Sequence, residues 1–342
     1  MPHIPENVKN LTLVESLMPY LVSQGKVGDK YDYPDNERLF LASRSDRISS
    51  DDFNLPLFAA AKGQVLTAFA DYWDRMLFKP LGITNHLAHS DVYPGRNKAK
   101  ELCEKFPGID LRRMLAVIKV KVLGYELIFR FHLGGSVWKQ YLENNGVVAG
   151  VQLPLRMKKW QKLEKPLFTP STKAAEGHDI NITQEEFFQA TGEIGRRLIE
   201  KLLVLCTEVY NHLEKRNIIM LDTKLESDGK IICDEWFNPD TSRFVSEANL
   251  AESIAKGVEP EFMDKQPVRD FCAKIVTPFY NEEGKQIIGL KGLDPKNPAH
   301  CRFVAEYDFP PSIAEELTRR FLKIFEMITG ENLVKYQAKY LL

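Results

Sequence analysis

The sequence predicts an α+β protein with two lobes, a small β-rich lobe followed by a larger α/β lobe. The chain has 342 residues, 44% hydrophobic and 27% charged, which is typical of a globular protein with a sizeable core. Chains of this length usually divide into two domains or lobes. Short apolar stretches separated by turn residues fill the first 60 positions, whereas helical periodicity is stronger later. We place the N-terminal lobe at residues 1–118 and the C-terminal lobe at 119–342.

The N-terminal lobe is expected to contain a small antiparallel sheet and one helix. Turn residues occur at 25–29 and 33–36, and the apolar run at 39–42 follows them. From Gly63 to about Leu77, apolar residues recur at helical spacing and predict one buried stripe. Residues 114–131 are rich in Val, Ile, Leu and Phe, and predict two strands that lead into the second lobe.

The C-terminal lobe is expected to combine helices with a β-hairpin. Residues 151–183 show little periodicity and predict a long ordered loop. Residues 185–216 predict one long helix or two. The residues expected to face inward from it are Phe188, Ile194, Leu198, Leu202, Leu205 and Val209. Strands at 218–226 and 230–236 form the hairpin, and an amphipathic helix spans 312–329.

Overall composition argues against several classes of partner. Lys and Arg total 46 against 47 for Asp and Glu, so no overall field favours nucleic acid or an acidic membrane. The sequence has no basic, apolar leader and no apolar run long enough to cross a bilayer, so we expect a cytoplasmic protein. Five widely spaced cysteines are expected to be reduced, mostly buried thiols. The sequence leaves open whether the chain forms a homo-oligomer.

Three polar segments are candidates for binding anions. Gly25 and Lys26 lie in a glycine-containing turn that suits phosphate, although a plain hairpin turn has the same composition. Residues 44–52 combine charges and hydroxyls that suit a polar ligand or a solvated, capped turn. Arg130 precedes Gly134-Gly135-Ser136, which fits an anion site or a glycine turn with a surface arginine.

Charged residues also alternate along a strand that is expected to be buried. Period-two alternation places Asp222, Lys224 and Glu226 on one face, and Asp234 follows on the next strand. Carboxylates there suit Mg²⁺ with triphosphate oxygens, and the alternative is a structural ion-pair network. The turn at 238–244 directs Arg243 toward the same end of the hairpin, or else serves only as a capping turn.

Metal binding by Glu226 and Asp234 makes a specific demand on the hairpin register. A two-residue turn would pair Ser227 with Lys230 and would direct the two carboxylates to opposite faces. A three-residue loop, residues 228–230, pairs Ser227 with Ile231 and brings the carboxylates onto the same face. We predict the three-residue loop.

Together, these segments occur in the order and spacing of SAICAR synthetases, which the chain resembles over about 250 residues. The matching pieces are GKVGD at 25–29, DRIS at 46–49, KGQVLT at 62–67, NHL at 85–87, GSVWKQY at 135–141, FTPSTKAAEGHD at 168–179, DTKLE at 222–226, DEWFNPDTSRF at 234–244 and DKQPVRDF at 264–271. The resemblance implies a bilobal fold, kinase-like or ATP-grasp-like, with ATP in the cleft. It also implies a ligase that joins L-aspartate to carboxyaminoimidazole ribonucleotide through an acyl phosphate, with ATP and Mg²⁺ as cofactors.

The resemblance assigns roles to matched positions. Gly25 and Lys26 would contact ATP phosphates, the strand at 120–123 with Val122 would meet adenine, and Glu226 and Asp234 would hold Mg²⁺. Asp222 and Lys224 would lie beside the reacting groups. The remaining substrate-binding candidates are Ser49, Arg130, Ser136, Ser171, Lys173, Arg243, Lys265 and Arg269.

The chain differs from the family pattern at one position of the first loop, and two other classes of function stay open. Gly28 stands where most relatives have a basic residue, and we expect Gly28→Arg to tighten ATP binding or to change little. A small-molecule kinase of related fold would use the same lysine and carboxylates, and a nucleotide-binding homologue that has lost catalysis would tolerate Gly28. His132 and His178 are expected to be structural rather than acid-base catalysts.

Overall fold

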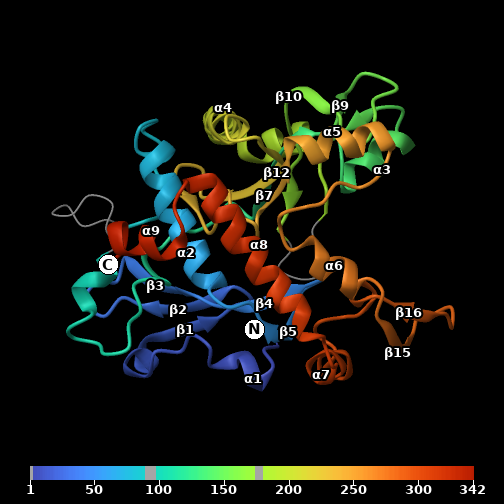
Figure 1. Ribbon diagram of the computed structural model, residues 1–342. Helices are drawn as coiled ribbons and strands as arrows, with labels where there is room; N and C mark the ends of the chain where they lie inside the picture. Colours follow the sequence, from blue (N-terminus) through green and yellow to red (C-terminus); the bar gives the residue numbers. More distant parts are fainter. Residues whose placement is uncertain (1–2, 89–97, 174–179) are drawn as a thin grey trace. The chain divides into compact units, whose positions relative to one another are not determined.

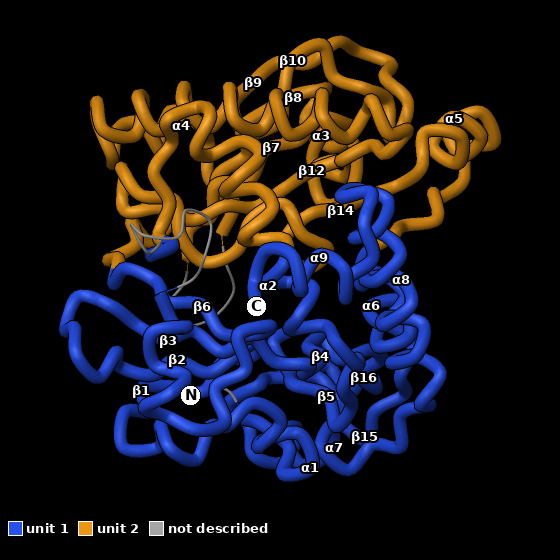
Figure 2. Tube along the Cα trace, turned by 60° about the vertical axis from the view of Figure 1, so that its left-hand side comes forward, with its two compact units in different colours: residues 1–68, 87–119, 264–342 blue, residues 69–86, 120–263 orange. Residues whose placement is uncertain are grey.

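The chain forms two compact units. The structure, a computed structural model, describes residues 3–88, 98–173 and 180–342. Unit 1 comprises residues 1–68, 87–119 and 264–342, and unit 2 comprises 69–86 and 120–263 (Figure 2). The segment 87–119 of unit 1 ends next to the division expected at 118/119. The segment 264–342, however, was expected in the C-terminal lobe and belongs to unit 1. In unit 1, this segment contributes the helix Pro311–Thr329, which packs against the strand Phe53–Phe58 and so buries its apolar face.

A four-stranded antiparallel sheet forms the centre of unit 1 (Figure 1). Its strands, in spatial order, are β1 (Leu21–Gln24), β2 (Gly28–Asp32), β3 (Leu39–Arg44) and β6 (Met114–Ile118). One face packs on a core that includes Tyr31, Leu41 and Met114. A separate ribbon pairs β4 (Arg47–Ser50) with β5 (Phe53–Phe58). The small antiparallel sheet expected from the sequence is confirmed.

Gly28 lies where two strands approach closely. It pairs with Arg44 across β2 and β3. A Cβ atom on Gly28 would lie 2.0 Å from the carbonyl oxygen of Ser43, which is a backbone atom. A side chain at Gly28 therefore does not fit on this backbone unless β2 and β3 move apart, which argues against the expectation that Gly28→Arg tightens ATP binding or changes little.

Helices and a hairpin complete unit 1. They are α1 (Glu6–Lys9), the 3-10 helices Glu15–Tyr20, Lys98–Leu102 and Leu290–Gly292, α6 (Gln266–Cys272), β15 (Val276–Tyr280), β16 (Gln286–Ile288), α7 (Pro298–Glu306), α8 (Pro311–Thr329) and α9 (Leu333–Tyr340). The helix expected at 312–329 is confirmed as α8, and Gly330 ends it in the left-handed conformation with φ 74°. Helix α9 was not expected.

Helix α2 (Lys62–Trp73) confirms the first predicted helix and continues as a π-helix over Asp74–Phe78.

Unit 2 is built on a six-stranded sheet with β7 and β12 at its centre (Figure 1). The strands are β7 (Tyr125–His132), β10 (Lys162–Phe168), β11 (Ser171–Thr172), β12 (Ile218–Ser227), β13 (Ile232–Cys233) and β14 (Ser242–Ser246). Strands β10 and β11 interrupt the segment that was expected to be a loop. The pairing of β10 with β7 shifts between Lys162 and Leu167, so the strand has no regular alternation to read from the sequence. The smaller elements are α3 (Ser136–Glu143), β8 (Val147–Val148), β9 (Val151–Gln152) and α5 (Glu247–Lys256).

The long helix α4 (Gln184–Glu214) packs on β12 and β10. Four of the six residues expected to face inward are buried, namely Leu198, Leu202, Leu205 and Val209. Phe188 is half-buried and packs against Phe168, whereas Ile194 is 54% exposed, so the expectation for Ile194 is wrong. The cause is Gly192, whose non-helical φ of 59° kinks the helix and changes the phase of the residues before and after it.

Candidate active site

Asp222 lies between two arginines in the middle of the unit 2 sheet. On β12 it pairs with Arg130 of β7 on one side and with Arg243 of β14 on the other. Cross-strand neighbours share a face, so both guanidinium groups reach the carboxylate. Arg130 Nη1 lies 2.7 Å from Asp222 Oδ2, and Arg243 Nε lies 2.9 Å from Oδ1. The structure thus brings together Asp222, Arg130 and Arg243, to which the resemblance assigns related roles.

This group carries a net positive charge. Arg130 is buried, and its burial lowers the pKa to about 10, although Asp222 acts in the opposite direction. Arg130 therefore stays protonated at neutral pH, and two guanidinium groups face one carboxylate. Arg130 also donates to Ser136 Oγ, 3.3 Å away at the first residue of α3. A helix N-terminus adds partial positive charge, so the arrangement suits an anion.

Gly134 and Gly135 make room for the side chains that surround this group. A Cβ on Gly135 would lie 2.4 Å from Arg243 Nη2, and one on Gly134 would lie 2.0 Å from the ring of Trp160. The Arg243 guanidinium carbon lies 5.3 Å from the centroid of the same indole ring. Trp160 is 2% exposed and donates from Nε1 to Glu259 at 2.8 Å. Trp160 was not predicted as a site residue, because the segment that contains it shows no periodicity.

Lys224 has a carboxylate partner on the neighbouring strand. Its Nζ lies 2.5 Å from Glu126 Oε1, and Ser171 Oγ lies 3.4 Å from Glu126 Oε2. Burial by itself would lower the pKa of Lys224, but the charges of Glu126, Glu226 and Asp234 outweigh it and raise the pKa. Glu126 was missed, although alternation along β7 from Arg130 would have placed it on the same face.

Glu226 and Asp234 interact electrostatically. Burial raises the pKa of the Glu226 carboxyl, and the charge of Asp234 raises it further. Lys173 Nζ lies 2.6 Å from both Glu226 carboxylate oxygens and opposes this effect. Lys173, Glu226 and Asp234 are therefore close together in unit 2, next to Lys224.

The predicted hairpin register is wrong. Ser227 pairs with Ile232 and Glu226 with Cys233, so the loop comprises residues 228–231. The Asp228 carboxylate accepts hydrogen bonds from the backbone N–H groups of Lys230 at 2.8 Å and Ile231 at 2.7 Å, which stabilises this longer loop.

This register alone would direct Asp234 away from Glu226. Asp234, however, follows the last paired residue, Cys233, and has a left-handed φ of 65°. That conformation breaks the alternation of side chains, so the strand register does not decide where the Asp234 carboxylate points. Its effect on the pKa of Glu226 shows that the two carboxyl groups are near each other.

These two carboxylates fit a Mg²⁺ ion only if other oxygen ligands complete its shell. In the described ranges, no group of three or more His, Cys, Asp or Glu side chains could hold a metal ion. Mg²⁺ commonly uses one or two carboxylates and takes its remaining ligands from phosphate and water. The donor set is therefore suited to a metal-nucleotide complex rather than to a free ion.

Five of the predicted residues lie in unit 1. Gly25 and Lys26 form the loop between β1 and β2, and the Lys26 side chain, 39% exposed, pairs with Asp52. Ser49 is half-buried on β4 opposite Asn54. Lys265 precedes α6 and Arg269 lies on it. Val122 lies in unit 2, in an irregular connection between β6 and β7, so the strand expected at 120–123 is not formed.

The segment at 44–52 is mostly buried within unit 1, and only Asp51 and Asp52 are exposed. Asp46 Oδ1 accepts from the N–H of Gly63 at 2.8 Å near the start of α2. Arg47 is buried against Asp29 at 2.6 Å. Residues 174–179, which include the second half of FTPSTKAAEGHD and His178, lie outside the described residues.

His132 is structural, as expected. Its Nδ1 donates to the Trp160 carbonyl at 2.8 Å, and Nε2 lies 3.1 Å from the hydroxyl of Tyr210. Because a carbonyl only accepts, the neutral ring carries its proton on Nδ1 and accepts from Tyr210. Burial lowers the pKa of His132 to about 4.

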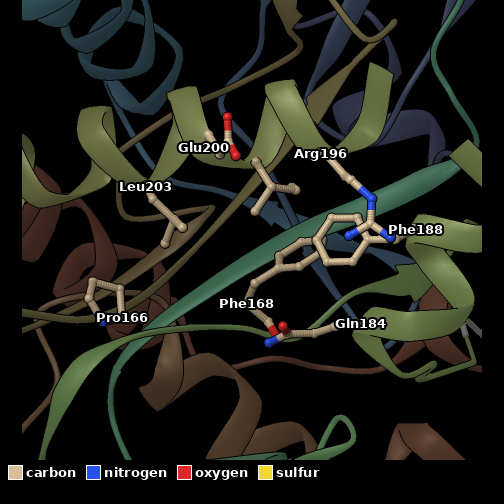
Figure 3. A pocket seen from close by; sticks show the side chains of 8 residues that line it. Pro166, Phe168, Gln184, Phe188, Arg196, Glu200 and Leu203 are labelled. Carbon is tan, nitrogen blue, oxygen red and sulfur yellow. The ribbon is translucent and has the colours of Figure 1, made fainter. Parts of the chain in front are cut away.

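A cavity of about 220 Å³ lies elsewhere in unit 2, between β10 and α4 (Figure 3). Phe168, Phe188 and Arg196 line it, and Figure 3 shows the Arg196 guanidinium against the Phe188 ring. It contains none of the predicted site residues. The candidate active site is therefore not this cavity but the group of charged residues on and around β12, namely Asp222, Lys224, Glu226, Arg130 and Arg243.

Two further features lie outside the site. All five cysteines are free, and four of them are buried. None of the helices that the structure describes is long and apolar enough to cross a membrane.

Comparisons with known proteins identify relatives of this chain. The family model described as SAICAR synthetase matches residues 21–286. The phosphoribosylaminoimidazole-succinocarboxamide synthase of Thermodesulfovibrio yellowstonii is 34% identical over 94% of this chain and 100% of its own length. The enzyme of that name from Schizosaccharomyces pombe is 33% identical over 91% of this chain and 94% of its own.

A solved structure is also similar. The SAICAR-synthase from Saccharomyces cerevisiae, complexed with SAICAR, matches with a TM-score of 0.71 and 27% identity, over 94% of this chain and 98% of that chain. The mixed α/β fold with antiparallel sheets is thus shared with a relative of known activity. The chain belongs to the SAICAR synthetase family.

Proposed function

We propose that this chain is an ATP-dependent ligase that joins L-aspartate to carboxyaminoimidazole ribonucleotide, giving SAICAR, ADP and phosphate. ATP-dependent ligation in purine biosynthesis is the activity of the family to which it belongs. The observation that supports it most directly is the position of Asp222 between Arg130 and Arg243, on the same strand face as Lys224 and Glu226.

Arg130, Ser136 and Arg243 bind the phosphate or carboxylate of the imidazole nucleotide in this proposal. Asp222 fixes both guanidinium groups, and the group retains one net positive charge for the ligand. Hydrogen bonds from arginine to an anion are charge-assisted and directional, so they orient the nucleotide as well as hold it.

Lys224 and Asp222 lie beside the reacting groups. The nucleotide carboxylate attacks the γ-phosphate of ATP, and the aspartate amine then displaces phosphate from the acyl phosphate. Both reactants of the first step are anionic, so catalysis depends on positioning and charge neutralisation. Lys224, whose pKa is raised by Glu126, supplies a lasting positive charge. Glu226 and Asp234 would hold Mg²⁺, which neutralises phosphate charge when bound.

The remaining contacts in this proposal are those that the resemblance implies. ATP is contacted by Gly25, Lys26 and Val122. These contacts go with a fold that is kinase-like or ATP-grasp-like. Ser49, Ser171, Lys173, Lys265 and Arg269 are candidates for binding aspartate or the nucleotide. A cytoplasmic location stays a prediction, and whether the chain forms a homo-oligomer stays open.

The test is a coupled assay that contains the imidazole nucleotide, ATP and aspartate, with each omitted in turn. We expect ADP release at full rate only with all three, because the acyl phosphate needs the amine to complete the reaction. ADP release at full rate without aspartate would support the alternative, a small-molecule kinase. ATP binding without any turnover would support a homologue that has lost catalysis.

A further inference from the structure

Arg47 and Asp29 form an ion pair that is sealed from solvent inside unit 1. Both side chains are 0% exposed, and Arg47 Nη2 lies 2.6 Å from Asp29 Oδ1. The Thr12 hydroxyl donates to the other Asp29 oxygen. Removing two charges from water is costly, and a buried ion pair often contributes no net stability. The Arg47–Asp29 pair is therefore better explained by a specific role than by general stability.

The same guanidinium group reaches the loop that carries Lys26. Arg47 Nη2 donates to the carbonyl oxygen of Gly25 at 2.9 Å, and Nη1 lies 3.3 Å from the carbonyl oxygen of Lys9. Within the loop, the N–H of Gly25 donates to the carbonyl of Gly28 at 2.7 Å.

The chain just before Arg47 holds the other side of this loop. The N–H of Ser45 donates to the carbonyl of Val27 at 2.6 Å. The Gly25 and Val27 carbonyls, which flank Lys26 in sequence, are thus both bound by the segment 45–47. The backbone at Lys26 is fixed, whereas its side chain stays partly exposed.

We propose that Arg47, oriented by Asp29, is a positioning residue that holds the Gly25–Gly28 loop in the conformation that binds ATP phosphates. This rests on the proposed function of Lys26. An arginine suits the task because its planar fork binds a carboxylate and a carbonyl at once in fixed directions. A lysine has one nitrogen and would keep the charge without the geometry.

The experiment compares Arg47→Lys and Arg47→Met with Leu41→Ala. Leu41 is a fully buried residue of β3 in the same sheet, so its truncation destabilises unit 1 without touching the loop. For each variant we would measure the KM for all three substrates, the Kd for ADP by calorimetry, and the unfolding midpoint.

Both Arg47 variants should raise the KM for ATP and the Kd for ADP by about tenfold, the value of a charge-assisted hydrogen bond, with the other two KM values nearly unchanged. Leu41→Ala should lower the unfolding midpoint without this selective effect. Equal changes in all three KM values, or an ADP Kd that matches the wild type, would overturn the proposal. If the wild type lacked ligase activity, the proposed function would fail, but ADP binding would still test Arg47.

Discussion

The Asp222 carboxylate pairs with the Arg243 guanidinium across strands β12 and β14. Asp222 also binds Arg130, so one carboxylate fixes the direction of two cations. The Trp160 ring and the absence of a side chain at Gly135 leave the Arg243 guanidinium in a defined place. A preorganised anion site of this kind should act on one substrate more than on the others.

Arg243→Ala should therefore raise the KM for the imidazole nucleotide far more than the KM for ATP. A charge-assisted contact is worth about 1.5–3 kcal/mol, which corresponds to roughly 10- to 100-fold. Steady-state kinetics with each substrate varied in turn would measure the difference. Arg196→Ala on α4 is the control, because Arg196 lines the separate cavity. Equal effects of Arg243→Ala on both KM values would mean that the arginine is structural.

Glu226→Gln should raise the Mg²⁺ concentration needed for half-maximal activity by about tenfold or more. The variant removes one anionic oxygen ligand from the pair that Asp234 completes. Titration of activity with Mg²⁺, and of Mn²⁺ binding in the presence of ADP, would measure it.

Asp228→Asn is the matched control for this metal prediction. Asp228 is a carboxylate of the same hairpin, but its oxygen accepts backbone N–H groups within the loop, and asparagine keeps that acceptor. We expect no change in Mg²⁺ requirement for Asp228→Asn. Unaltered Mn²⁺ binding by Glu226→Gln would remove Glu226 from the metal site.

His132 should make the protein less stable in mild acid. Its pKa is about 4 in the folded protein against 6.5 for an exposed histidine, so the unfolded chain binds more protons between these limits. Stability is fully present above about pH 6.5 and is lost as the pH falls toward 4. For this one group, the loss between pH 7.5 and 5 is about 2 kcal/mol.

Urea unfolding of the wild type and His132→Gln at both pH values would measure this loss. The variant should be less stable at pH 7.5 but should lose less stability on acidification. His212, whose pKa burial also lowers to about 4, would account for part of the loss that remains. Identical pH dependence of the two proteins would show that His132 does not titrate in this way.

The sequence predicted those features of the structure that depend on neighbouring residues alone, such as side-chain alternation and helix ends. Alternation along β12 correctly grouped Asp222, Lys224 and Glu226, and the Pro and Gly signals correctly bounded α8. The hairpin register failed because the Asp228 carboxylate stabilises a longer loop, and the left-handed Asp234 then breaks the alternation. Neither follows from periodicity.

Other misses depended on contacts between distant segments. Trp160 takes its position from packing against Arg243 in unit 2, and no local pattern marks it, whereas alternation along β7 would have indicated the face of Glu126 but not its pairing with Lys224. The exposure of Ile194 follows from a kink at Gly192 that a helical pattern cannot show. The helical segment 264–342 joins unit 1 because its apolar faces find partners there.

Gly28→Arg should destabilise the protein and weaken ATP binding rather than restore a phosphate contact. A Cβ at this position would lie 2.0 Å from the Ser43 carbonyl oxygen, so β2 and β3 must separate, at a cost of about 1–3 kcal/mol or more. The same shift would move the loop that carries Lys26. Lys30→Arg, an exposed change on the same strand, is the control and should leave unfolding and the Kd for ADP unaltered. Tighter ADP binding by Gly28→Arg, with wild-type stability, would show that the two strands separate at little cost.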